Sequence, residues 1–182
     1  MKFKSTTLQD ATLIELEKRG DDRGFFARTM CVEEFKAAGL ETVFVQQNMS
    51  ASKYKGTLRG MHFQRAPHQE VKLIRCTRGA ILDVIVDIRP SSPSFMKHEA
   101  FELSDQNHLQ LYVPRGFAHG FQTLTDDVEV TYLVSAAYHP ASEGGLRYSD
   151  PALGISWPLE VTTISDKDAN WGLITDPRAI AL

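Results

Sequence analysis

Two histidines stand in short segments whose residue types and spacing suit chemistry. His62 lies in the segment Leu58–Gln64, and His119 lies in the segment Val113–Gly120. Glycine or proline near each histidine fixes the backbone, as a catalytic or binding site requires. An imidazole can act as a general acid or base near neutral pH, or it can bind a metal. A single histidine beside apolar residues is more often a packed core or turn residue. Two such segments in one chain favour a functional site.

Short strand-like runs separated by turns must position these segments. Alternation of apolar and polar residues predicts strands, and the predicted strands are 43–45, 71–76, 80–88, 109–114 and 128–134. In the 80–88 run, the even-numbered apolar side chains share one face, whereas Asp83 and Asp87 point to the other.

The signal for helices is weak and confined to two places. Residues 32–38 can form two turns that stop at Gly39, and Ser165 can cap a short helix that begins at Asp166. Many short strands and few helices are typical of an all-β sandwich or barrel. We therefore predict a single all-β domain over residues 1–182.

Length and composition exclude several classes of protein. The chain has 182 residues, of which 42% are hydrophobic and 24% charged, so it is neither disordered nor fibrous. A net charge of −3 predicts no nucleic-acid or membrane partner. Two cysteines are too few for a disulfide framework. The first residues lack the apolar stretch of a secretory signal, so we predict a cytoplasmic protein.

The Pro-x-Gly-x-x-His element that ends at His119 resembles the second motif of cupins, which are double-stranded β-helix jelly rolls. Many cupins bind a metal through a His-x-His-plus-Glu first motif and a histidine of the second motif. In this chain Gln64 stands where the second histidine of the first motif would be. A transition metal needs three or four converging ligands, so we expect no metal. A metal-dependent cupin with His62, His119 and a carboxylate such as Glu70 is the alternative.

Further motifs follow one another from about residue 20 to residue 170. They are Asp22–Phe26, Gln46-x-Asn48, Gly56–Gln64, Lys72–Cys76, Val84–Arg89, Ser92–Phe95, Pro114–Phe121, Asp150–Pro158 and Ser165–Asp168. Together they resemble the dTDP-4-dehydrorhamnose 3,5-epimerase family. The resemblance implies a cupin-like jelly roll that forms a homodimer. It also implies epimerisation of a nucleotide-linked 4-keto-6-deoxyhexose at C3, C5 or both, without metal or organic cofactor.

The chemistry of that reaction explains the catalytic residues that the resemblance implies. A C4 ketone acidifies the protons on C3 and C5, so epimerisation needs a base, an acid on the opposite face of the ring, and a group that stabilises the enolate oxygen. The resemblance implies His62 as the base and Asp168 as the group that orients it. It implies Tyr132 as the acid and Lys72 as the cation at the C4 oxygen. Taken singly, Tyr132 would be a core residue and Lys72 a surface lysine.

The resemblance also implies a set of substrate-binding residues. They are Arg23, Phe26, Gln46, Asn48, Arg59, His119, Tyr138, Glu143 and Lys167. Cationic side chains suit a pyrophosphate because they donate charge-assisted hydrogen bonds, and an arginine can donate two in parallel. The aromatic rings of Phe26 and Tyr138 offer stacking surfaces. The segment that carries Arg23 and Phe26 is expected to reach into the partner subunit, so that the two subunits share their sites.

Two positions depart from the family pattern. Arg28 stands where the family has a glutamate near the nucleoside, and Leu133 stands where a lysine is common. A reversed charge in a contact region alters binding preference. A single-carbon epimerase that acts on another nucleotide sugar is therefore a second alternative, and a catalytically silent sugar-nucleotide binding module is a third.

Overall fold

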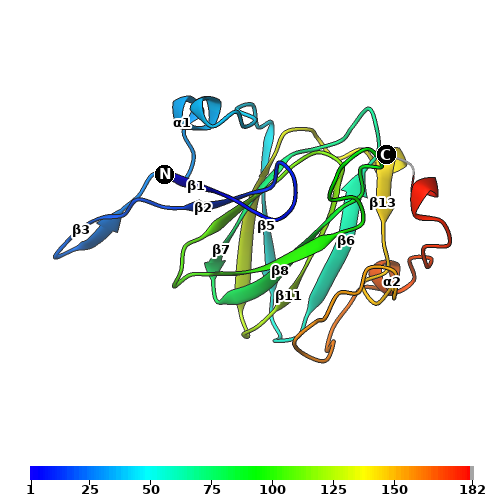
Figure 1. The fold of residues 1–182 in the computed structure, drawn as a ribbon. Helices are drawn as coiled ribbons and strands as arrows, with labels where there is room; N and C mark the ends of the chain where they lie inside the picture. Colours follow the sequence, from blue (N-terminus) through cyan, green and yellow to red (C-terminus); the bar gives the residue numbers. More distant parts are fainter. Residues whose placement is uncertain (181–182) are drawn as a thin grey trace.

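A computed structural model of the protein describes residues 1–180, which form two antiparallel sheets (Figure 1). The six-stranded sheet contains, in spatial order, β1 (Lys2–Ser5), β2 (Thr12–Glu15), β10 (Gln110–Val113), β7 (Lys72–Arg78), β12 (Val128–Val134) and β5 (Gln46–Ser52). The five-stranded sheet contains β13 (Glu143–Gly145), β6 (Leu58–Gln64), β11 (Phe117–Thr123), β8 (Ala80–Asp87) and β9 (His98–Ser104). Strands distant in the sequence pair in both sheets, as in a jelly roll. The all-β prediction is confirmed.

Outside the two sheets, a hairpin projects from one end of the molecule, where Figure 1 shows it in blue. It consists of β3 (Arg19–Asp21) and β4 (Gly24–Phe26). The helical segments are α1 (Val32–Ala37), α2 (Asp166–Ala169) and the 3₁₀ turns η1 (Pro140–Ser142) and η2 (Pro177–Ala179). Among residues 1–180, no helix combines the length and apolar character that a membrane crossing requires.

The main hydrophobic core lies between the two sheets. Ile74 and Val130 of the six-stranded sheet pack in one cluster with Ile85 and Phe121 of the five-stranded sheet. Removing these side chains from water is the principal stabilising contribution to the fold. Tyr132, two positions after Val130 on β12, packs against the same cluster but is only partly buried. It therefore lies at the edge of this core.

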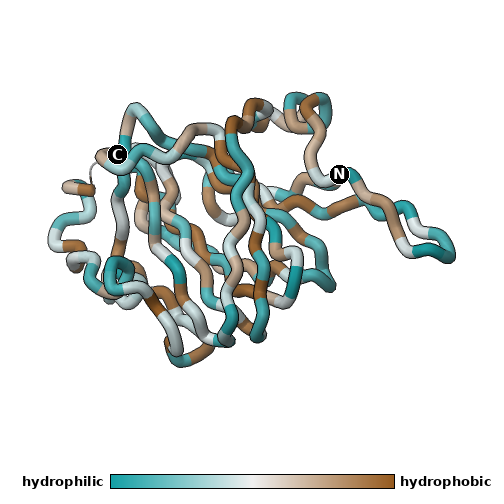
Figure 2. Tube along the Cα trace, turned by 180° about the vertical axis from the view of Figure 1, so that it is seen from behind, coloured by the Kyte–Doolittle hydropathy of each residue, from teal (hydrophilic) through white to brown (hydrophobic). Residues whose placement is uncertain are grey.

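A second cluster covers the outer face of the five-stranded sheet. Val84, Val86 and Ile88 pack there with residues of the C-terminal segment, including Leu153 and Trp157. The shared apolar face predicted for residues 80–88 is therefore confirmed. Figure 2 shows the corresponding alternation of hydrophobic and hydrophilic residues along several strands. The opposite face is buried as well, because Asp83 and Asp87 are both fully inaccessible to solvent.

The predicted strand over residues 43–45 is wrong, because β5 begins only at Gln46. The carboxylate of Glu41 accepts hydrogen bonds from the backbone amides of Thr42 and Val43, each at 3.0 Å. These two amides are therefore engaged locally and do not enter a sheet. The other predicted strands and both predicted helices are confirmed, with ends that differ by at most two residues.

Candidate active site

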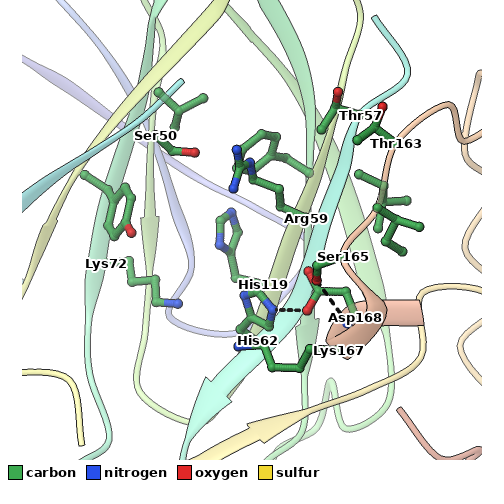
Figure 3. A pocket seen from close by; sticks show the side chains of 15 residues that line it. Ser50, Thr57, Arg59, His62, Lys72, His119, Thr163, Ser165, Lys167 and Asp168 are labelled. Atoms are coloured by element: carbon green, nitrogen blue, oxygen red, sulfur yellow. Dashed lines mark hydrogen bonds and ion pairs between the residues drawn. The ribbon is translucent and has the colours of Figure 1, made fainter. Parts of the chain in front are cut away.

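A cavity of about 600 Å³ opens between the sheets, next to the main core. The described residues that line it are Ser50, Thr57, Leu58, Arg59, His62, Lys72, His119, Phe121, Val130, Tyr132, Thr163, Ile164, Ser165, Lys167 and Asp168. Figure 3 shows Ser50 and Lys72 towards one side, Ser165 and Asp168 towards the other, and the two histidines between them. All four predicted catalytic residues therefore line one cavity, together with Arg59 and His119.

Two glycines bring β6 and β11 close enough to set the histidines side by side. A Cβ atom on Gly60 would lie 2.5 Å from the Cα atom of Gly120, and Gly60 has a φ of +118° that other residues rarely adopt. The strand register pairs His119 with His62 and shifts just beyond, between His119 and Phe121. Paired residues on antiparallel strands point to the same face of a sheet. Both imidazoles therefore belong to the same wall of the cavity.

His62 and Asp168 form a tightly held pair, although 106 positions separate them in the sequence. Nε2 of His62 lies 2.6 Å from Oδ1 of Asp168, and the backbone amide of Gly60 donates to Oδ2 at 3.1 Å. Ser165 caps α2 and accepts a hydrogen bond from the amide of Asp168 at 3.2 Å. The side chain of Asp168 is 5% exposed, against 33% for His62. The buried carboxylate therefore fixes the orientation of the imidazole by this hydrogen bond, and the more exposed imidazole lines the cavity.

The environment of Asp168 keeps its carboxyl group ionised. Burial alone would raise the pKa of Asp168, but the hydrogen bond and charge of His62, with the Gly60 amide, lower this pKa below its usual value. An ionised carboxylate accepts the proton of Nε2, so Nδ1 of His62 keeps its lone pair. This nitrogen can act as a base towards a molecule in the cavity.

Tyr132 and Lys72 come from the six-stranded sheet, on strands β12 and β7. Burial raises the pKa of Tyr132 and the nearby Glu70 carboxylate raises it further, while the Arg59 guanidinium acts in the opposite direction. The phenol therefore keeps its proton at neutral pH and can donate it. Because His62 belongs to the five-stranded sheet, a base and an acid stand on facing sheets of the same cavity.

His119 has its own buried partner, Asp83 of β8, which sequence reasoning did not identify as a site residue. Nε2 of His119 lies 2.9 Å from Oδ2 of Asp83, whose side chain is fully buried. Within residues 1–180, Oδ1 of Asp83 has no hydrogen-bond partner. An acidic residue in an otherwise apolar strand was the signal that could have drawn attention to it.

Five of the other predicted binding residues gather around a smaller neighbouring cavity of about 260 Å³. They are Gln46, Asn48, Tyr138, Glu143 and Lys167, and this cavity shares His62, Lys72, Tyr132 and Lys167 with the larger one. Glu143 accepts from the phenol of Tyr138 at 3.1 Å and pairs with Nζ of Lys167 at 2.6 Å. These contacts orient polar groups beside His62, which lines the same cavity.

The structure does not bring Arg23 or Phe26 to the cavity of their own chain. Both belong to the projecting hairpin, where the Arg23 side chain is 90% exposed and pairs with Asp21, and Phe26 is 68% exposed. Arg28 bonds to Glu34 at 2.7 Å near the base of the hairpin and lines neither of the two site cavities.

The three ligands of the alternative metal site have separate partners. His62 bonds to Asp168, and His119 bonds to Asp83. Glu70 pairs with Lys72. Over the described part of the chain, no three His, Cys, Asp or Glu side chains gather as a metal site requires. Each of these side chains has an acid–base partner of its own.

Comparisons with known proteins give one family. The sequence model of the dTDP-4-dehydrorhamnose 3,5-epimerase family matches residues 5–176. A dTDP-4-dehydrorhamnose 3,5-epimerase from Sinorhizobium fredii is 44% identical over 171 residues, which cover 93% of this chain and 88% of that protein.

Solved structures agree with this result. The crystal structure of a dTDP-4-dehydrorhamnose 3,5-epimerase from Bacillus anthracis, with TDP and PPi bound, matches with a TM-score of 0.92 and 43% identity, covering 94% of this chain and 98% of that one. A 3'-monoepimerase from Streptomyces bikiniensis, in complex with dTDP-quinovose, matches with a TM-score of 0.86 and 34% identity, covering 93% and 86%. The predicted cupin-like jelly roll is thereby confirmed.

Proposed function

Because this chain belongs to the dTDP-4-dehydrorhamnose 3,5-epimerase family, we propose that its cavity epimerises a dTDP-linked 4-keto-6-deoxyhexose with His62 as base and Tyr132 as acid. The protein is an isomerase of deoxysugar biosynthesis. The observation that supports the residue roles most is the placement of these two side chains on facing sheets of one cavity. Inversion at a carbon needs that arrangement, because one face loses a proton and the other gains one.

The reaction begins when Nδ1 of His62 removes the proton from a carbon next to the C4 ketone. The electron pair of the broken C–H bond moves into the ring, and negative charge develops on the C4 oxygen. The ammonium group of Lys72 stabilises this enolate. Asp168 stabilises the imidazolium of His62 that forms at the same time.

The second half of the reaction restores the ketone with the opposite configuration. Tyr132 transfers its phenolic proton to the other face of the same carbon, and the enolate electrons return to form the new C–H bond. Exchange with solvent then returns the proton to Tyr132 and removes the extra proton from His62. Solvent and the side chains of this protein supply every proton transfer in these steps.

The nucleotide part of the substrate extends from the catalytic pair towards the smaller cavity. Arg59 and Lys167 supply positive charge for the pyrophosphate, and Gln46, Asn48, Tyr138 and Glu143 supply polar and aromatic contacts. Arg59 is held in place by hydrogen bonds to the side chain of Ser52 at 3.1 Å and the carbonyl of Ala51 at 3.0 Å. His119, held by Asp83, lines the larger cavity together with Arg59.

The active form is a homodimer with shared sites. The hairpin carries Arg23 and Phe26 away from the cavity of its own chain and leaves the Phe26 ring largely exposed. A partner subunit whose cavity receives this hairpin would cover that apolar surface. The predicted cytoplasmic location belongs to the same proposal.

A time course of NMR spectra in D₂O with dTDP-4-keto-6-deoxyglucose tests the function. Loss of the C3 and C5 proton signals with inversion at both carbons is the expected result for a 3,5-epimerase. Loss of one signal would define a single-carbon epimerase, as the 3'-monoepimerase relative is described. Intact signals at both carbons would contradict the proposed activity. Dialysis against EDTA before the assay should leave the rate unchanged.

A further inference from the structure

Glu70 contacts the proposed catalytic machinery, although it takes no part in the proposed proton transfers or substrate contacts. It precedes β7, and its Oε1 atom lies 3.1 Å from Nζ of Lys72. Its other carboxylate oxygen accepts a hydrogen bond from Nε2 of Gln64 at 2.7 Å. The side chains of Glu70 and Lys72 are only 12% and 13% exposed. In such a setting, a charged partner is costly to remove because it leaves the other charge partly buried and uncompensated.

Gln64 fixes Glu70 in turn. The residue is 5% exposed and belongs to β6, two positions after His62. Its Nε2 atom also lies 3.0 Å from the carbonyl of His68 and 3.2 Å from that of Ala137. Its Oε1 atom accepts from the amide of His139 at 2.7 Å. The reversed amide would point an oxygen at carbonyl and carboxylate oxygens, so the contacts allow one orientation.

We propose that Glu70 is a positioning residue, supported by Gln64, that holds the Lys72 ammonium in place at the enolate oxygen. This inference rests on the proposed function, in which Lys72 stabilises that oxygen. A lysine side chain has four flexible carbons and a compact charge. Without a fixed partner, its ammonium group would spread over several rotamers, and loss of placement by about 1 Å can reduce a rate about a hundredfold.

A carboxylate suits this position better than an amide would. Lys72 and Gln64 both direct donors at residue 70. A carboxylate offers an oxygen to each of them, whereas an amide turns an NH₂ group towards one. The negative charge of Glu70 also raises the pKa of Tyr132, after the larger effect of burial. The other ionisable groups around the smaller cavity are His62, Tyr138, Glu143 and Lys167.

A double-mutant cycle tests the proposal with dTDP-4-keto-6-deoxyglucose as substrate. Glu70→Ala should lower kcat about tenfold or more while changing KM much less, because the ammonium acts at the enolate. In a Lys72→Ala background, the same substitution should change kcat less than twofold, because its target is already absent. A double variant whose loss of kcat equals the product of the two single losses would overturn the proposal, because Glu70 would then act independently of Lys72. Glu15→Ala is the matched control, because Glu15 pairs with Lys4 at 2.6 Å and with Lys2 at 3.3 Å on the outer strands β1 and β2.

Glu70→Gln provides a second test in a variant of nearly the same shape. Its kcat should fall, and the alkaline limb of its pH profile should move to lower pH, because the negative charge that favours the protonated phenol of Tyr132 is gone. A wild-type kcat at neutral pH would contradict the proposal.

The cycle separates this inference from the function on which it rests. Full activity of Lys72→Ala would remove Lys72 from the mechanism and the role of Glu70 with it. If kcat falls strongly in Lys72→Ala but stays at the wild-type value in a folded Glu70→Ala enzyme, the positioning role of Glu70 is wrong and the proposed role of Lys72 stands.

Discussion

At the scale of single residues, His62 and Asp168 form one hydrogen-bonded pair. Asp168 holds the imidazole by a 2.6 Å contact and stays ionised in a buried place. Substitution of His62 by Asn, or of Asp168 by Ala, should lower kcat by roughly 10³–10⁴, as loss of an oriented base does in other enzymes. Affinity for dTDP should change little, because the proposed nucleotide contacts come from other residues. Steady-state kinetics and calorimetric titration with dTDP measure the two quantities, and a fully active variant would remove the substituted residue from the mechanism.

The lowered pKa of Asp168 predicts a pH dependence of stability. A carboxyl group with a lower pKa in the folded protein than in the unfolded chain, where it is about 3.9, stabilises the fold above that value. This stabilisation is lost as the pH falls through the folded pKa. Asp168→Asn should therefore reduce the free energy of unfolding by about 1–3 kcal/mol at pH 7, and the difference should shrink below about pH 4. Urea titrations from pH 3 to pH 8 test this, and a difference that disappears between pH 5 and pH 7 would contradict it.

The sequence predicts some site residues better than others. His62 and His119 attract attention because glycine and proline lie beside them. Nothing in the spacing pairs His62 with Asp168, since their contact depends on where α2 meets β6, and only the family resemblance joins them. The sequence marks Asp83 only as an acidic residue in a largely apolar strand, and Glu70 only as a candidate metal ligand, because their actual contacts depend on partners that tertiary structure brings to them.

At the scale of secondary structure, the close approach of the paired strands β6 and β11 positions the histidines. A Cβ atom on Gly120 would meet Sδ of Met61 at 2.6 Å and the carbonyl of Arg59 at 2.8 Å. Gly120→Ala should therefore reduce the free energy of unfolding by about 1–3 kcal/mol. It should also lower kcat, because it displaces the strands that carry His62 and His119.

Thermal unfolding and kinetics of a matched control check this prediction. A Cβ atom on Gly172 would have no neighbour within 4 Å, so Gly172→Ala should leave both the stability and kcat close to wild type. Equal effects of the two substitutions would show that the close approach of the strands is not the cause.

Strand alternation predicts most of the fold because β-strands have a period of two residues. The strand predicted over residues 128–134 coincides with β12. The prediction for residues 43–45 is wrong because their apolar side chains suit a strand, whereas the amides of Thr42 and Val43 donate hydrogen bonds to the Glu41 carboxylate instead of to a neighbouring strand. The pattern alone also assigned Tyr132 to the core, and the structure shows it both packed against the core and lining the cavity.

At the scale of the whole molecule, the projecting hairpin connects assembly to activity in the proposed homodimer. Arg23 and Phe26 line neither site cavity of their own chain, so their proposed role depends on a partner subunit. A His62→Asn subunit and an Arg23→Ala/Phe26→Ala subunit should each form nearly inactive homodimers. In a mixed dimer, one site combines an intact His62 from one chain with an intact hairpin from the other. Random pairing of equal amounts should restore about a quarter of wild-type activity.

Size-exclusion chromatography and kinetics of the mixture provide the measurement. Activity that stays at the sum of the two homodimers, although mixed dimers form, would show that each site is complete within one chain.

The central claim is that a base and an acid on facing sheets act on opposite faces of one carbon. The most direct measurement is NMR of Tyr132→Phe in D₂O with dTDP-4-keto-6-deoxyglucose, with wild type and His62→Asn as references. We predict that Tyr132→Phe incorporates deuterium next to the ketone with retained configuration, because His62 can return a deuteron only to the face from which it took the proton. His62→Asn should incorporate none. Inversion by Tyr132→Phe at the wild-type rate would contradict the claim and leave Tyr132 as a residue that lines the cavity without donating a proton.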